Sequence, residues 1–143
     1  MHHVAVMKKS WGFLEKIARG EKTIESRWYQ TKRIPWGRVA AGDVIYFKNS
    51  GNPIVFTATV AKVLQFAGIN PQKVKAILAK YGKQDGIKRA EFPKFYRLFK
   101  NKRYCILIFL RTLERVAPFH IDKTGFGAMS AWVSIEDIRS IKV

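Results

Sequence analysis

Hydrophobic and polar residues change their spacing several times along the chain, and each change predicts a new element. Alternating or continuous runs of apolar and β-branched residues predict strands, because successive side chains of a strand point to opposite faces. Apolar residues three or four positions apart predict helices with one buried stripe. The predicted strands cover residues 3–7, 23–29, 43–48, 54–63 and 104–113, with a closing segment over residues 131–141.

The predicted helices are marked by their ends as well as by their apolar stripes. Ser10 is the expected N-cap of a first helix, and Gly20 lies just past its end, where a left-handed residue is favoured. Asn70 is expected to cap a second helix that begins at Pro71. A third helical stretch is predicted at roughly residues 90–101.

The order of these elements indicates the fold class. Strands and helices do not alternate regularly, which disfavours a doubly wound parallel sheet. Long hairpins interrupted by a helical insertion favour an α+β fold, a small curved or closed β-barrel with helices packed on the outside. The length of 143 residues predicts a single domain over residues 1–143, with the basic helical insertion at about 70–102.

The composition predicts a packed, cytoplasmic domain. Hydrophobic residues make up 48% of the chain, and no apolar run approaches the ~20 residues of a membrane span. The N-terminus lacks the apolar stretch of a secretory signal. Cys105 lies in the apolar run 104–110, which favours a buried, unreactive thiol. His3 and His120 stand apart from other ligand residues, so we expect no metal and no cofactor.

The net positive charge is the main indication of the binding partner. The chain carries 27 Lys and Arg against 10 Asp and Glu, a formal net charge of +17. Such a field attracts polyanions, which makes nucleic acid the favoured partner, and we find no basic amphipathic helix suited to a membrane. Eleven of these cations lie within residues 73–103, against only Asp85 and Glu91, so the insertion is predicted to present a basic face to phosphates. A basic surface that serves only solubility is the alternative.

Residues 20–27, GEKTIESR, place opposite charges together in a chain with few acids. In a strand, Glu25 and Arg27 point to the same face, and Lys22, at the corner before the strand, can reach that side. A glutamate between two cations stays ionised and orients both. Such a cluster can clamp an anion or present a lysine that shares a proton with a substrate. An exposed ion pair without function is the alternative.

Aromatic rings lie beside cations near this stretch. Trp28 follows Arg27, and Trp36 lies in a loop that contains Pro and Gly, where an exposed ring would stack on an unpaired base. Core packing is the alternative for both rings. Lys48 and Lys123 are expected on Gly-containing loops, either as further anion ligands or as solvated side chains.

The G-x-K-x-x-E-x-R motif of one known family is matched by Gly20, Lys22, Glu25 and Arg27. With the GDVIYF strand behind it, this sequence resembles the ASCH domain (activating signal cointegrator homology), a family of the PUA-like superfamily. The resemblance covers residues 3–63 well and the end of the chain loosely. It implies a PUA-like barrel with a cleft lined by the Lys, Glu and Arg of the motif, suited to RNA or a nucleotide. It also implies a role in RNA processing or transcription coactivation.

Some members of that family are enzymes. One branch hydrolyses the acetyl amide of N4-acetylcytidine with the motif Lys, a Thr at the position of Glu25 and a Glu from the later helical region. Its resemblance implies that Lys22, Glu25 and Glu91 would be catalytic here, although Glu25 departs from the Thr of that branch. Other members are linked to ribonuclease activity, for which Lys22 would donate a proton and Arg27 would bind the phosphate.

The sequence therefore predicts an RNA-binding domain that holds a nucleotide or phosphate in a Lys-Glu-Arg cleft. A small hydrolase that uses the same cleft on a nucleoside or on RNA is the rival hypothesis. An adaptor that binds an acidic protein surface is the third.

Overall fold

The computed structural model describes residues 1–127 and 129–143. Within these residues, six strands form one sheet in the order β2-β5-β4-β3-β1-β6. The strands are β1 (His2–Met7), β2 (Ile24–Tyr29), β3 (Val44–Asn49), β4 (Ile54–Ala67), β5 (Tyr104–Phe119) and β6 (Trp132–Ile135). The helices are α1 (Phe13–Ala18), α2 (Pro71–Tyr81) and α3 (Phe92–Phe99), with 3-10 turns at Lys9–Trp11, Arg89–Glu91 and Ile138–Ser140.

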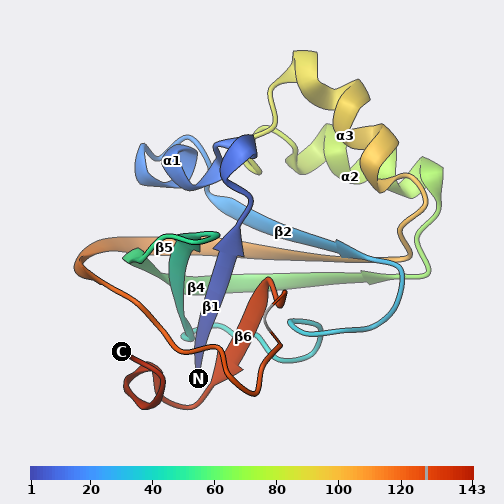
Figure 1. The fold of residues 1–143 in the computed structure, drawn as a ribbon. Helices are drawn as coiled ribbons and strands as arrows, with labels where there is room; N and C mark the ends of the chain where they lie inside the picture. The colour runs from blue at the N-terminus through green and yellow to red at the C-terminus, as the bar shows by residue number, and fades with distance from the viewer. Residues whose placement is uncertain (128) are drawn as a thin grey trace.

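The sheet is curled rather than flat. Strands β4 and β5 pair antiparallel along their whole length, and three register shifts near the start of β4 bend the ladder. Figure 1 shows β2, β4 and β5 lying along one axis, with β5 antiparallel to the other two, while β1, β3 and β6 cross them steeply. The antiparallel pairing of β3 with β4 joins the two halves. Within the second half, β1 pairs parallel with β3 and antiparallel with β6. The α+β fold predicted from the order of elements, a curved sheet with helices packed on the outside, is confirmed.

The main core lies between the sheet and the helices. Residues 105–108 of β5 are all buried, as the continuous apolar run predicted, and burial raises the pKa of the Cys105 thiol. Helix α2 contributes Val74, Ile77 and Leu78 to the same core. A smaller cluster of buried residues is formed by Val4, Ile54, Val133 and Ile138. None of the helices in the described part of the chain has the length and apolar character needed to span a membrane.

The first helix begins differently from the prediction. Ser10 lies in a 3-10 turn and does not cap α1, because Gly12, with φ of 69°, separates that turn from the helix. A glycine adopts this left-handed conformation without the steric cost that other residues have. At the other end, Gly20 is left-handed with φ of 77°, as predicted. The Asn70 cap of α2 is also confirmed, since its side chain accepts a hydrogen bond from the Lys73 backbone.

Two strands extend further than the pattern of apolar residues indicated. Strand β4 continues to Ala67 and β5 to Phe119. Most residues of 111–119 are exposed, so burial does not explain this extension. The backbone ladder between β4 and β5 does, because strand pairing requires no particular side chain.

Candidate functional site

A cleft of about 240 Å³ opens between β2, the residues that follow β1, and the turn after α2. Its polar lining is formed by Glu25, Ser26, Arg27 and Asp85, and Lys8 stands at its edge. Its aromatic lining includes Trp11, Phe13, Trp28, Tyr29 and Phe99. Ala131, from the segment before β6, completes one side. The cleft therefore combines ring surfaces with charged groups from segments far apart in the sequence.

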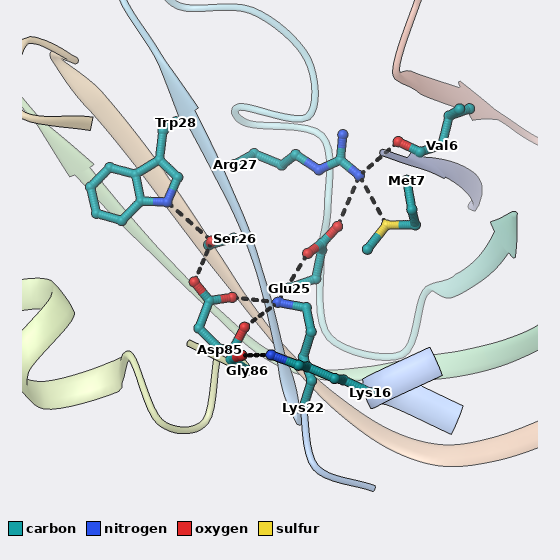
Figure 2. A network of polar contacts seen from close by, with 10 residues as sticks. All are labelled: Val6, Met7, Lys16, Lys22, Glu25, Ser26, Arg27, Trp28, Asp85 and Gly86. Carbon is teal, nitrogen blue, oxygen red and sulfur yellow. Dashed lines mark hydrogen bonds and ion pairs between the residues drawn. The ribbon is translucent and has the colours of Figure 1, made fainter. Parts of the chain in front are cut away.

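Lys22 lies at the base of this site with a side chain that has no exposed surface. Its Nζ donates hydrogen bonds to the backbone oxygen of Asp85 at 2.7 Å and to Asp85 Oδ1 at 2.5 Å. It also forms an ion pair with Glu25 Oε1 at 3.3 Å (Figure 2). An ammonium group has three protons, so each one has an oxygen acceptor. Lys22 thus holds the two carboxylates together.

Glu25 and Arg27 form the second half of the polar cluster. Arg27 Nη2 lies 2.8 Å from Glu25 Oε2, and the Arg27 side chain is 12% exposed. Arg27 Nη1 also donates to the backbone oxygen of Ala131 at 3.2 Å, and Nη2 lies 3.5 Å from the backbone oxygen of Val6. The guanidinium packs over the ring of Trp132, 5.2 Å from its centre. Arg27 is therefore held in one orientation by three different segments.

Asp85 connects Lys22 to the cleft. Its Oδ2 accepts a hydrogen bond from Ser26 Oγ at 2.5 Å, and that hydroxyl accepts one from Trp28 Nε1 at 3.0 Å. Burial raises the pKa of Asp85, while the positive charge of Lys22 and the hydrogen bonds from Lys22 and Ser26 oppose that rise. We call Lys22, Glu25, Ser26, Arg27 and Asp85 the buried network.

The turn after α2 places Asp85 in the network. The Asp85 backbone NH donates to the Tyr81 carbonyl, and Gln84 O accepts from the NH groups of Thr23 and Ile24 at the start of β2. Gly86 is left-handed with φ of 82°, and an added Cβ there would come within 3.1 Å of the Lys22 side chain. The turn is thus packed directly against Lys22.

Sequence reasoning missed both Asp85 and Ser26. In the sequence, Asp85 is only one of two acids in a basic segment, and no pattern marks Ser26 as a site residue. The available signal was an Asp-Gly pair just past the end of a helix, which marks a turn able to carry a functional side chain.

Glu91 and Trp36 are predicted site residues that lie outside the cleft lining. Glu91 Oε1 accepts a hydrogen bond from the Lys88 backbone at 3.1 Å and lies 3.6 Å from Lys16 Nζ. Trp36 packs edge-to-face on Tyr104 with ring centres 5.2 Å apart. Asp85, not Glu91, is the acid from the helical insertion that reaches Lys22.

The remaining predicted residues are placed as follows. Trp28 lines the cleft and stacks on Phe99 with ring centres 4.5 Å apart and an interplanar angle of 5°. The prediction that Lys48 lies on a loop is wrong, because β3 continues to Asn49 and the Lys48 side chain is buried. Lys123 donates to the Ser130 backbone at 2.7 Å. Burial lowers the pKa of Lys48, and the charge of Lys123 lowers it further. Neither lysine lines the cleft.

Comparison with solved structures shows that the chain has an ASCH-type fold, as the motif predicted. The ASCH protein of Zymomonas mobilis aligns with a TM-score of 0.69 over 99% of this chain and 96% of that chain, at 16% identity. A point variant of the same protein also gives 0.69, over 97% and 93% of the two chains at 16% identity. A hypothetical protein of solved structure is 23% identical, with a TM-score of 0.52 over 81% of this chain and 100% of its own. No protein-family model and no curated protein matched the sequence.

Proposed function

We propose that the cleft binds single-stranded RNA by holding one unpaired base against its rings while Arg27 contacts the neighbouring phosphate. One observation carries the proposal: an aromatic cleft with a partly exposed guanidinium lies in a chain of net charge +17. Stacking on aromatic side chains is worth about 1–3 kcal/mol per base, and cations supply the phosphate contacts. RNA processing, one of the roles implied by the sequence resemblance, would use such a site.

Each member of the buried network has a part in this proposal. Lys22 has no exposed surface, so it orients Glu25 and Asp85 instead of contacting RNA itself. The carboxylate oxygens retain lone pairs that accept hydrogen bonds from the amino group of a base. Arg27 presents the planar fork that suits a phosphate group. The cations of the helical insertion would contact further phosphates without reading the bases.

Substitution of Arg27 tests this proposal. We expect Arg27→Ala to weaken binding of labelled single-stranded RNA by at least about tenfold, the value of one charge-assisted hydrogen bond. Lys142→Ala, which removes one cation far along the chain, should weaken it less than twofold. Arg27→Lys should fall between the two, because the charge remains and the fork is lost. Thermal melting of each variant shows whether it is folded. Equal losses in Arg27→Ala and Lys142→Ala would reject the proposal.

Hydrolysis in the same cleft is a second candidate, favoured by the hydrogen-bonded chain from Lys22 through Asp85 to Ser26. A carboxylate whose pKa burial raises accepts protons better than an ordinary one, and it lies where a water or the Ser26 hydroxyl would need a base. Incubation with N4-acetylcytidine, followed by chromatography for cytidine, tests amide hydrolysis. Incubation with labelled RNA, followed by gel analysis, tests ribonuclease activity. Release of either product at a rate abolished by Ser26→Ala would replace binding alone with catalysis.

A further inference from the structure

A second hollow, of about 190 Å³, lies between α1 and the turn after α2. It is lined by Lys16, Arg19, Glu21, Lys83, Gly86, Ile87 and Lys88, and we call it the basic hollow. Ile87 also lines the cleft, and Asp85 and Gly86 are consecutive residues that line one site each. Consecutive Cα atoms are only about 3.8 Å apart, so the cleft and the basic hollow adjoin across this turn.

The basic hollow carries an excess of positive charge. Arg19 and Glu21 form an exposed pair, with Arg19 Nη2 2.8 Å from Glu21 Oε2. Lys16 donates to the backbone oxygen of Gly86 at 2.6 Å. Lys83 and Lys88 are exposed, and neither forms an ion pair with a residue that the structure describes. Two cations are therefore left to meet a ligand.

The positive field of these cations reaches the acid that lines the basic hollow. A hydrogen bond from Arg19 holds the pKa of Glu21 below its usual value, and the charges of Lys88 and Lys16 lower it further. Glu21 thus stays ionised and remains paired with Arg19. Its single negative charge does not cancel the cations around it.

The turn between the two sites is fixed at several consecutive carbonyl groups. Gln84 O accepts from the Thr23 and Ile24 backbone, Asp85 O accepts from Lys22 and Gly86 O from Lys16. Lys16 and Lys22 come from opposite sides of the α1–β2 corner. A turn held in this way keeps the cleft and the basic hollow at a constant separation, which is the preorganisation that a two-part ligand requires.

We propose that the basic hollow binds a phosphate of the same RNA strand whose base occupies the cleft. This inference rests on the proposed function and adds to it a direction for the strand, across Ile87 toward Lys83 and Lys88. The phosphate is held by the two lysine ammonium groups, with Lys16 as the nearest further cation. The protein would then bind one base in the cleft and at least one phosphate on the other side of the turn.

A double variant, Lys83→Gln with Lys88→Gln, tests the inference against a matched control. The control, Lys62→Gln with Lys142→Gln, removes the same two charges from exposed positions outside the helical insertion and outside both sites. The probes are a mixed-sequence RNA tetranucleotide and the four ribonucleosides, titrated by NMR or calorimetry. We expect the hollow variant to lose about tenfold in affinity for the tetranucleotide and nothing for a nucleoside. The control should lose less than twofold on both.

The salt dependence provides a second reading. Each phosphate contact that is lost lowers the log–log slope of affinity against salt by about 0.7 for a single strand. The hollow variant should lose one to two such contacts and the control none. Equal losses in the two variants, or an unchanged affinity of the hollow variant, would overturn the inference and leave RNA binding in the cleft intact.

Failure of the proposed function gives a different result. If the unaltered protein binds neither the tetranucleotide nor any nucleoside, the cleft is not an RNA site. Titration with inorganic pyrophosphate, followed through the amide signals of residues 83–88, then tests the basic hollow alone. Saturable shifts that disappear in the Lys83→Gln, Lys88→Gln variant would support an anion site there, and an absence of shifts would overturn it.

Discussion

Lys22 is a charged side chain with no exposed surface, which is uncommon because removing an ammonium group from water costs several kcal/mol. Its three oxygen partners offset that cost, and Arg27 balances the second carboxylate. Two cations and two anions therefore alternate along the buried network. Removal of Lys22 leaves Asp85 buried without a cation partner.

Substitution of Lys22 should therefore affect stability before it affects binding. We expect Lys22→Met to lower the free energy of unfolding by about 3–5 kcal/mol, the usual effect of breaking a buried ion pair. The double variant with Asp85→Asn should lose less than the sum of the two single variants, since both act on one interaction. Denaturant unfolding measures both effects. A loss below about 1 kcal/mol in Lys22→Met would contradict the account of Lys22 as a structural centre.

Individual residues of the site were predicted unevenly. Lys22, Glu25 and Arg27 meet as expected, because period-two geometry and a long lysine stem bring them together. Asp85 lies far along the chain, and its place depends on how the turn after α2 packs, which no local pattern encodes. Trp36 was predicted to be an exposed stacking ring because its loop contains Pro and Gly, but it packs on Tyr104.

At the scale of elements, the His3 side chain connects β1 to β6 and to the residue that precedes β3. Its Nδ1 lies 2.8 Å from Ser134 Oγ in β6, and its Nε2 lies 2.8 Å from Asp43 Oδ2 just before β3. The ring is fully buried and packs against Trp132. Burial lowers the pKa of His3 from 6.5, although the hydrogen bond and the charge of Asp43 act in the opposite direction. His3 thus joins three strands while neutral.

This arrangement predicts a stability that depends on pH. Because the pKa of His3 is lower in the folded state, the unfolded chain binds protons more readily once the pH falls below about 6.5. The stability from neutral His3 is present above that pH and is lost as the pH falls toward the folded-state pKa. Urea unfolding between pH 7.5 and 5.5 should show this decline in the unaltered protein. His3→Gln should remove most of the slope; an unchanged slope would assign it to other groups.

Most elements followed from local patterns, and the exceptions have physical causes. The Asn70 cap, the hairpin of β3 and β4 and the buried part of β5 all depend on neighbouring residues. The extension of β5 to Phe119 depends instead on its partner strand, which the hydrophobic pattern does not report. The delayed start of α1 depends on a single left-handed glycine that interrupts an otherwise helical pattern.

Over the whole molecule, the charge determines how binding responds to salt. Lys and Arg exceed Asp and Glu by 17, and the buried network contributes nothing to this excess because its own charges cancel. Long-range attraction of the RNA that we propose as ligand would therefore come from exposed cations, which salt screens.

We expect RNA affinity to fall steeply as salt rises, with a log–log slope of about 0.7 for each phosphate contacted on a single strand. A slope of two or more would indicate that cations beyond Arg27 take part. Filter binding between 50 and 300 mM KCl measures it, with a nucleoside as the control, whose affinity should change little. A flat dependence on salt would rule out the helical insertion as a phosphate-binding surface.

The overall fold was predicted more securely than the shape of the cleft. The order of elements and the motif at residues 20–27 both led to the ASCH-type fold that the solved structures share. The cleft, in contrast, is completed by Val6, Ile87 and Ala131. These residues carry no chemical signal in the sequence, because they contribute backbone and apolar surface to a space that only the folded chain creates.

The position of Arg27 has a mechanical consequence. Strand β2 begins the order of the sheet and β6 ends it, yet the Arg27 guanidinium on β2 reaches the carbonyl groups of Val6 and Ala131 beside the far end. The Arg27 side chain therefore links the two edges of the curled sheet. The ligand that we propose for the cleft would contact the same guanidinium, so binding and the contact between the two edges of the sheet would depend on one side chain.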